Sequence, residues 1–306
     1  MIPELTLEGH SPSFDVNHLT PAQKKYIDKQ TLANDRIFKD VLSDKGILAN
    51  VIRVFLGFSV TSIQYINTED YRKAAPDYAS AVKFDVICQT EDGRTVNVEV
   101  QNAKTSDLIR RARFYSSMMD AFFVDTKRGT DYSIPDSFVL FFCSDDSYPF
   151  TGSVAYGSMS YVTVGDGASS ARGVRDGRNI MFVNFDKIAS GEAVPLGFNG
   201  KAFCTMFRPG YGLTGSIFDD AVRRLNMFKE SAVGMSEILK EQYEREHLEA
   251  LLAKERAEER DAMLVSLFAG LKRNGYTRDK ALRLAQEVLQ DVPDVSLIKA
   301  LERIFM

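Results

Sequence analysis

The chain has 306 residues, of which 44% are hydrophobic and 26% charged, and its formal net charge is −4. This length suits one large domain or two ordinary ones, and the composition excludes a disordered or fibrous protein. The acidic balance does not by itself indicate a nucleic-acid binder, although a local basic patch matters more than the total charge.

The three cysteines, Cys88, Cys143 and Cys204, show no metal-binding spacing. Cys88 and Cys143 lie in apolar runs, which predicts buried thiols in a reducing compartment. The first residues lack the basic and apolar regions of a signal peptide, and no stretch is long and apolar enough to span a bilayer. We therefore expect a cytoplasmic protein without a membrane partner.

The N-terminal third is predicted to be mainly helical. Residues 1–30 read as an irregular arm that ends in a helix start at Thr20-Pro21, with Thr at the N-cap and Pro just inside the helix. Helical periodicity runs from about residue 31 to residue 56, with Gly46 as a possible interruption and Gly57 as the expected C-cap. Residues 60–66 then read as a strand.

Two β-branched segments, residues 82–89 and 95–101, flank the turn signal Asp92-Gly93 and predict a β-hairpin. With a three-residue loop and a left-handed Gly93, Asp85 lies opposite Glu99 and Lys83 opposite Gln101. Strand alternation separates two faces. The apolar face holds Val82, Phe84, Val86, Cys88, Val96, Val98 and Val100, and the polar face holds Lys83, Asp85, Asn97, Glu99 and Gln101.

The opposed carboxylates of Asp85 and Glu99 should repel each other, and a bound divalent cation would remove that cost. The other interpretation is the wet face of an ordinary hairpin, although Asp is disfavoured in mid-strand. The inference depends on the register, because a slip by one residue would send one carboxylate into the core.

After the hairpin, residues 105–107 are predicted to cap a helix that runs to about residue 124. Residues 137–143 form an apolar run typical of a strand buried on both faces. Residues 144–179 read as a loop with a short strand at 161–164, residues 180–185 as a strand, and residues 190–216 as a glycine-rich loop.

From residue 217 onward the pattern is helical. Residues 236–260 predict a long solvated helix, which is either a spacer or a self-associating segment that would give a homodimer. Three helical pieces follow, and the break at Asn274-Gly275 allows a helix-turn-helix interpretation beside that of a simple helical hairpin. We predict the divisions 1–30 (arm), 31–216 (main domain), 217–262 (charged helix) and 263–306 (small helical region).

The order helix, three antiparallel strands, helix and buried strand resembles the core of the PD-(D/E)XK nuclease fold, an α/β fold with a mixed sheet flanked by helices. Within this order the chain carries Asn34-Asp35-x-x-Phe38-Lys39, Lys83-Phe84-Asp85-Val86, Asp92-Gly93, Val98-Glu99-Val100-Gln101 and Arg113-x-Tyr115. By these motifs it resembles, more narrowly, the Rpn family of recombination-promoting nucleases or putative transposases over about residues 31–190.

The resemblance implies a metal-dependent DNA endonuclease. Asp85, Glu99 and the carbonyl of Val100 would bind Mg²⁺, or Mn²⁺ as a substitute, and Asp35 would complete the site from a helix expected over the polar hairpin face. Asp35 could instead be a solvated partner of Lys39, four residues on, and Glu69 is the fallback ligand. Gln101 stands where the superfamily commonly has Lys, so Gln101 and Lys83 are expected to position water and phosphate.

DNA is the partner that the resemblance implies. Lys104, Arg110, Arg113 and Tyr115 follow the hairpin and are the candidate DNA-binding residues, with a mixed-charge helix that covers the sheet as the other interpretation. The neutral Gln101 leaves open a second function. In it, the chain is a weak or inactive nuclease-fold module that binds DNA or protein through its C-terminal helices.

Overall fold

The computed structural model describes residues 13–66, 84–126, 134–161, 174–191, 196–211, 213–289 and 291–305. These residues fall into two compact units, Ser13–Leu239 and a second one that contains the C-terminal helices from Lys240 onward. Among the described helices, none combines the length and the apolar character that crossing a membrane requires.

A mixed six-stranded sheet forms the centre of the first unit, with the strand order β1-β2-β3-β4-β6-β5. Strands β1, β2 and β3 are antiparallel neighbours, β3, β4 and β6 run parallel, and β5 is an antiparallel edge strand. The strands are β1 (Ile63–Tyr65), β2 (Val86–Thr90), β3 (Thr95–Gln101), β4 (Ser137–Cys143), β5 (Val154–Tyr161) and β6 (Val174–Asn184).

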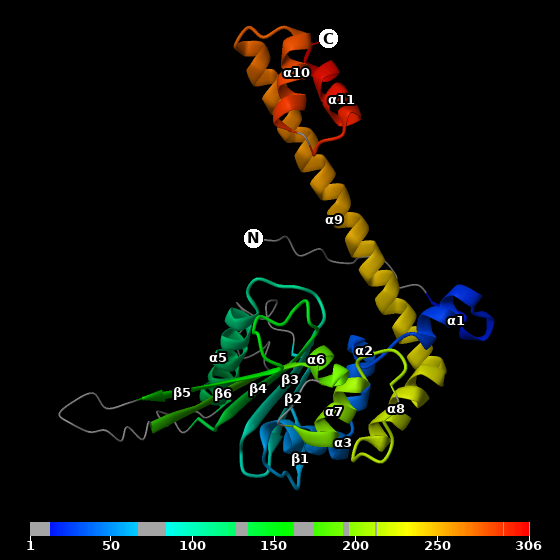
Figure 1. Cartoon of the computed structure of the whole chain (residues 1–306), viewed down its shortest axis with the longest axis vertical. Coiled ribbons are helices and arrows are strands. Elements are labelled where there is room, and N and C mark those ends of the chain that lie inside the picture. The colour runs from blue at the N-terminus through cyan, green and yellow to red at the C-terminus, as the bar shows by residue number, and fades with distance from the viewer. Residues whose placement is uncertain are drawn as a thin grey trace, which may run out of the picture. The chain divides into compact units, whose positions relative to one another are not determined.

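Helices cover both faces of this sheet (Figure 1). Helix α5 (Leu108–Thr126) packs on one face, where Leu108, Ala112 and Met119 meet Val139 and Phe141. The larger core lies on the other face, under the remaining helices. These are α2 (Asp35–Leu42), α3 (Lys45–Val51), the π-helical turn η2 (Ile52–Leu56), α6 (Phe185–Ser190), α7 (Gly197–Thr205) and α8 (Asp219–Glu230); the short η1 (Val16–His18) and α1 (Pro21–Asp28) precede them.

The larger core is rich in phenylalanine. The ring of Phe142 on β4 is fully buried and lies 4.9 Å from that of Phe55 and 5.2 Å from that of Phe203, between ring centroids. Aromatic pairs in such edge-on and tilted arrangements add stability beyond their buried area. Strand β4 is central and both of its faces are covered, which explains why residues 138–143 are apolar.

The predicted hairpin and its register are confirmed. Val86 pairs with Val98 and Cys88 with Val96, and Gly93 adopts a φ of 87° in the turn. One face assignment was wrong: Phe84 packs against Tyr115 on the α5 side, with ring centroids 5.1 Å apart, and does not join the face of Val86. Phe84 precedes β2, so strand alternation does not extend to it.

Other sequence predictions hold in part. Thr20 caps α1 through a capping box with Gln23, and Gly57 is the left-handed C-cap. The interruption in the segment 31–56 lies at Ser43-Asp44 instead of Gly46, because the Asp44 side chain caps α3. Of the strand expected at 161–164, Tyr161 ends β5 (Val154–Tyr161), and residues 162–164 lie outside the described residues. The segment 197–205, predicted as loop, is helix α7.

The second unit contains most of the long helix α9 (Ala232–Arg273), followed by α10 (Arg278–Val288) and α11 (Asp294–Phe305). Leu264 and Phe268 of α9, Ala281 and Ala285 of α10, and Leu297 and Leu301 of α11 form its buried core. The fold class is thus confirmed as a mixed sheet flanked by helices with a helical C-terminal region. Helix α8, beyond the predicted division at 216, packs against α2 within the first unit; the predicted domain division stays a prediction.

Candidate metal and active site

The hairpin register brings Asp85 and Glu99 together. Asp85 directly precedes β2, and its backbone N–H donates a hydrogen bond to Glu99 Oε1 at 3.0 Å. The N–H of Val100 donates to Asp85 Oδ2 at 3.1 Å in return. Each carboxylate is therefore held by a peptide group of the opposite strand, so the pair predicted from the sequence is a built feature of the hairpin.

Lys39 supplies a cation to Asp85. Its Nζ lies 3.2 Å from Asp85 Oδ1 and 2.9 Å from Asp35 Oδ2, so one ammonium bridges two carboxylates. Asn34 caps α2 by accepting hydrogen bonds from the N–H groups of Arg36 and Ile37, which places Asp35 in the first turn. The predicted pair of Asp35 with Lys39 is present, and Lys39 also joins Asp35 to the hairpin.

Arg111 supplies the second cation, from α5. Its Nη2 lies 3.2 Å from Glu99 Oε2, and the Glu99 side chain is fully buried. Helix α5 thus covers Glu99 on the polar face of the hairpin, whereas the side chains of Asp85 and Arg111 remain 11% and 33% exposed. Helix α2, which we expected over the polar face, packs its Ile37 and Phe38 into the core on the opposite face.

Burial dominates the electrostatics of the acidic pair. It raises the pKa of Asp85 to about 6, against the opposing attraction of Lys39 and with a further contribution from Asp35. Burial, and then the charge of Asp85, raises the pKa of Glu99 well above its ordinary value. Burial alone would lower the pKa of Lys39, but Asp85 and Asp35 together raise it. The cluster consequently holds more negative charge than its environment favours.

Sequence reasoning did not assign these contacts to Lys39 and Arg111. Lys39 entered as the partner of Asp35, and Arg111 was not among the candidate site residues. The available signal was physical: a carboxylate predicted in a buried strand needs a cationic partner, and the flanking helices are where one can come from.

Of the remaining predicted site residues, the structure describes Gln101 and Val100. Gln101 ends β3 and is buried, with Arg111 bonded to its side-chain oxygen. The N–H of Val100 binds Asp85, whereas its carbonyl remains a predicted metal ligand. Lys83 and Glu69 lie outside the described residues.

The predicted DNA-binding residues differ in exposure. Lys104, Arg110 and Arg113 are exposed, and the two arginines are three residues apart on α5. Tyr115 is 4% exposed, and its ring packs between Phe84 and Phe141, so its contact with DNA stays a prediction. A DNA backbone could reach the three cations without any rearrangement of the core.

The donor chemistry of Asp85 and Glu99 fits a hard divalent cation. Carboxylate oxygens are the ligands that Mg²⁺ prefers, and the raised pKa values show an acidic pair whose charge a cation would stabilise. Within the described ranges, no three acidic, histidine or cysteine side chains are grouped as a metal site. The pair is therefore a partial ligand set, which is usual for Mg²⁺ because water and substrate oxygens complete its shell.

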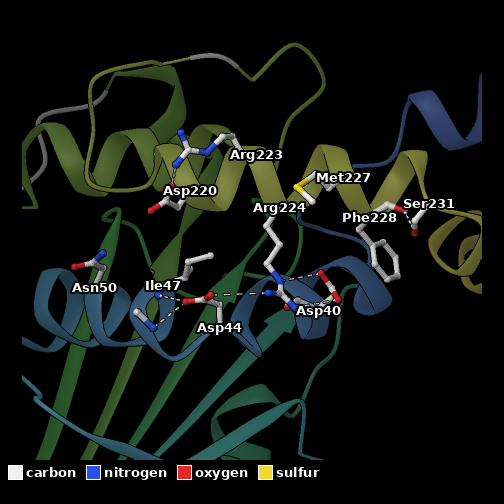
Figure 2. Close-up of a pocket in the computed structure, with 11 residues that line it drawn as sticks. Asp40, Asp44, Ile47, Asn50, Asp220, Arg223, Arg224, Met227, Phe228 and Ser231 are labelled. Carbon is white, nitrogen blue, oxygen red and sulfur yellow. Dashed lines mark hydrogen bonds and ion pairs between the residues drawn. The ribbon is translucent and has the colours of Figure 1, made fainter.

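A pocket of about 510 Å³ lies elsewhere in the first unit, between α2, α3 and α8. Figure 2 shows Arg224 of α8 reaching across it to Asp40 of α2, with Nε 3.0 Å from Asp40 Oδ2. Asp44, which also lines the pocket, caps α3 by accepting hydrogen bonds from the N–H groups of Gly46 and Ile47. These charged groups bond one another, and the contact joins α8 to α2.

Residues 22–145 match the family model described as a PD-(D/E)XK nuclease family transposase. The match covers less than half of the chain and includes Asp35, Lys39, Asp85, Glu99 and Arg111. Comparisons with curated proteins and with solved structures gave no match.

Proposed function

We propose that the chain is a Mg²⁺-dependent endonuclease that hydrolyses phosphodiester bonds of DNA in transposase-like recombination, because residues 22–145 match the model of a PD-(D/E)XK nuclease family transposase. The observation that carries the proposal is the reciprocal hydrogen bonding of Asp85 and Glu99 across the hairpin. It fixes two acidic side chains side by side where repulsion would otherwise separate them.

In this proposal Asp85 and Glu99 hold the metal, with the carbonyl of Val100, and Asp35 assists from α2. When bound, Mg²⁺ would neutralise charge on the scissile phosphate and lower the pKa of a bound water. Lys39 lies between Asp35 and Asp85, so its ammonium balances the carboxylates before a metal binds.

The exposed cations at the start of α5 support DNA as the substrate. Lys104, Arg110 and Arg113 lie within the same connection and helix that cover the acidic pair. Phosphate contacts of this kind position a duplex without reading its sequence. They would also make binding dependent on salt.

One observation favours a second function, a binding module without catalysis. Lys39 and Arg111 already form ion pairs with Asp85 and Glu99, so the two carboxylates have cationic partners without a metal. In that case the helical unit would provide the binding surface, and Val288 and Val295 there are 68% and 77% exposed. Self-association of two copies through these helices belongs to either proposal.

Plasmid nicking separates the two functions. Wild type and Asp85→Asn are incubated with supercoiled plasmid in Mg²⁺ and in EDTA. Asn retains an oxygen for the Val100 N–H, so the variant keeps the hairpin bond and loses only the charge. Glu230→Gln, at an exposed carboxylate on α8, is the matched control.

The endonuclease proposal expects nicking by wild type and by Glu230→Gln in Mg²⁺, none in EDTA, and none by Asp85→Asn. Equal nicking by Asp85→Asn would show that the activity comes from another site or a contaminant. DNA binding without nicking by any of the proteins would support the binding module.

A further inference from the structure

Both polar atoms of the Gln101 side chain are bonded within the protein. Its Nε2 donates to the carbonyl of Ala103 at 2.6 Å, and its Oε1 accepts from Arg111 Nη1 at 2.6 Å. The residue is only 9% exposed. Gln101 is thus held between the loop that follows β3 and the guanidinium of Arg111. These contacts fit a residue that positions Arg111.

Arg111 is fixed in place from several directions. Besides the bonds to Gln101 and Glu99, its Nε donates to the Tyr115 hydroxyl at 3.1 Å. Its guanidinium carbon lies 5.1 Å from the centroid of the Tyr115 ring and 5.8 Å from that of Phe141. A guanidinium held by three hydrogen bonds and two aromatic rings has little freedom left to lose when it binds a ligand.

The hydrogen bonds of Arg111 leave donors to spare. A guanidinium carries five N–H groups, and three of them have acceptors among the described residues: Tyr115, Gln101 and Glu99. In the part of the chain that the structure describes, one N–H on each Nη has no acceptor, and the side chain is 33% exposed. Guanidinium N–H groups of this kind form strong, charge-assisted hydrogen bonds to phosphate oxygens.

Lys39, the other cation at the acidic pair, differs from Arg111 in the carboxylates that it contacts. Its ammonium is bonded to Asp35 and Asp85, two of the proposed metal ligands, so it competes with a metal at both. Among the described residues, Arg111 is bonded to one carboxylate oxygen, Glu99 Oε2, while Glu99 Oε1 is bonded to the N–H of Asp85. Arg111 is therefore the cation that can contact a substrate and still remain paired.

We propose that Arg111 binds the scissile phosphate of DNA beside Glu99 through its two remaining N–H groups, and that Gln101 and Tyr115 position it. The proposal rests on the proposed nuclease function and adds the residue that contacts the phosphate. In this arrangement Arg111 on α5 supplies the positive charge that the neutral Gln101 does not. Gln101 then acts through Arg111 and does not meet the water or the phosphate itself.

The test measures binding of a short fluorescent duplex in EDTA, by anisotropy over a range of salt concentrations. Arg111→Gln removes the charge, and Arg111→Lys keeps a charge for Glu99 but removes the paired N–H groups. Arg223→Gln on α8, an exposed arginine that pairs with Asp220, is the matched control. Thermal unfolding of each variant accompanies the binding data.

Loss of a phosphate contact should weaken binding by Arg111→Gln about tenfold or more and reduce the slope of log affinity against log salt by about one. Arg111→Lys should keep the slope and still bind about tenfold more weakly, since the bidentate geometry is lost. Arg223→Gln should match wild type. If Arg111→Gln fails to fold because Glu99 loses its partner, the affinity of Arg111→Lys decides whether Arg111 contacts the phosphate.

Wild-type affinity and slope in both Arg111 variants would overturn this inference and leave the proposed nuclease intact, because nicking by wild type is measured separately. An affinity loss in Arg111→Gln without a change in slope would assign Arg111 a structural role only. A wild type that neither binds the duplex nor nicks plasmid would remove both proposals together.

Discussion

Replacing Asp85 by Asn is expected to stabilise the metal-free protein at neutral pH, although it removes a proposed metal ligand. Burial, opposed by Lys39, raises the pKa of Asp85 from its ordinary 3.8 to about 6. A raised pKa of an acid means that its contribution to stability is complete below 3.8 and is lost as the pH rises through 6. Asn does not titrate, so it avoids this loss.

Each pKa unit corresponds to about 1.4 kcal/mol, so the raised pKa of Asp85 corresponds to a loss of about 3 kcal/mol above the higher pKa. For a unit of this size, the midpoint of thermal unfolding shifts by about 2–4 °C per kcal/mol, which predicts a rise of about 6–12 °C in Asp85→Asn. The assay is thermal unfolding by circular dichroism in EDTA at about pH 7.5 and again at about pH 4.

The variant should be more stable than wild type at the higher pH and nearly equal to it at the lower pH. An unchanged or lower midpoint at the higher pH would refute the reasoning, because it would mean that Lys39 and the peptide hydrogen bonds outweigh burial. A gain of the same size at both pH values would show that the effect is not linked to the ionisation of Asp85.

Three further predictions concern the supports of the site. Lys39→Met removes the bridge between Asp35 and Asp85 and should lower the free energy of unfolding, measured by urea unfolding in EDTA, by about 1–2 kcal/mol. The loss should be smaller in Mg²⁺. Asn34→Ala removes the cap of α2 and should cost about 1–2 kcal/mol in the same assay, whereas a cost near zero would contradict the capping role. Phe142→Ala should cost about 3–5 kcal/mol because the ring is fully buried, and Phe150→Ala, at a 36% exposed ring, should cost much less.

The hairpin could be read from the sequence because its determinants are local. The Asp92-Gly93 turn fixes the loop, the loop fixes the register, and the register places Asp85 beside Glu99. The buried strand at 137–143 could also be predicted, because a run of apolar residues of strand length is favourable only where both faces of the strand are covered.

The partners of the acidic pair could not be derived in the same way. Lys39 and Arg111 reach the hairpin from helices that lie on opposite faces of the sheet, and helix periodicity does not say which face a helix covers. Helix α7 was missed because two glycines, Gly197 and Gly200, suggested a loop, whereas Ala202 and Phe203 bury enough apolar surface to favour the helix.

The most direct test of the account is the position of a divalent ion. Crystals of the full chain grown or soaked with Mn²⁺ would show it by anomalous scattering, with Asp85→Asn crystals as the control. The account predicts a peak in contact with carboxylate oxygens of both Asp85 and Glu99 in wild type, and none in the variant. A peak bound elsewhere, or Lys39 still bonded to Asp85 at saturating Mn²⁺, would contradict a metal-dependent active site in this hairpin.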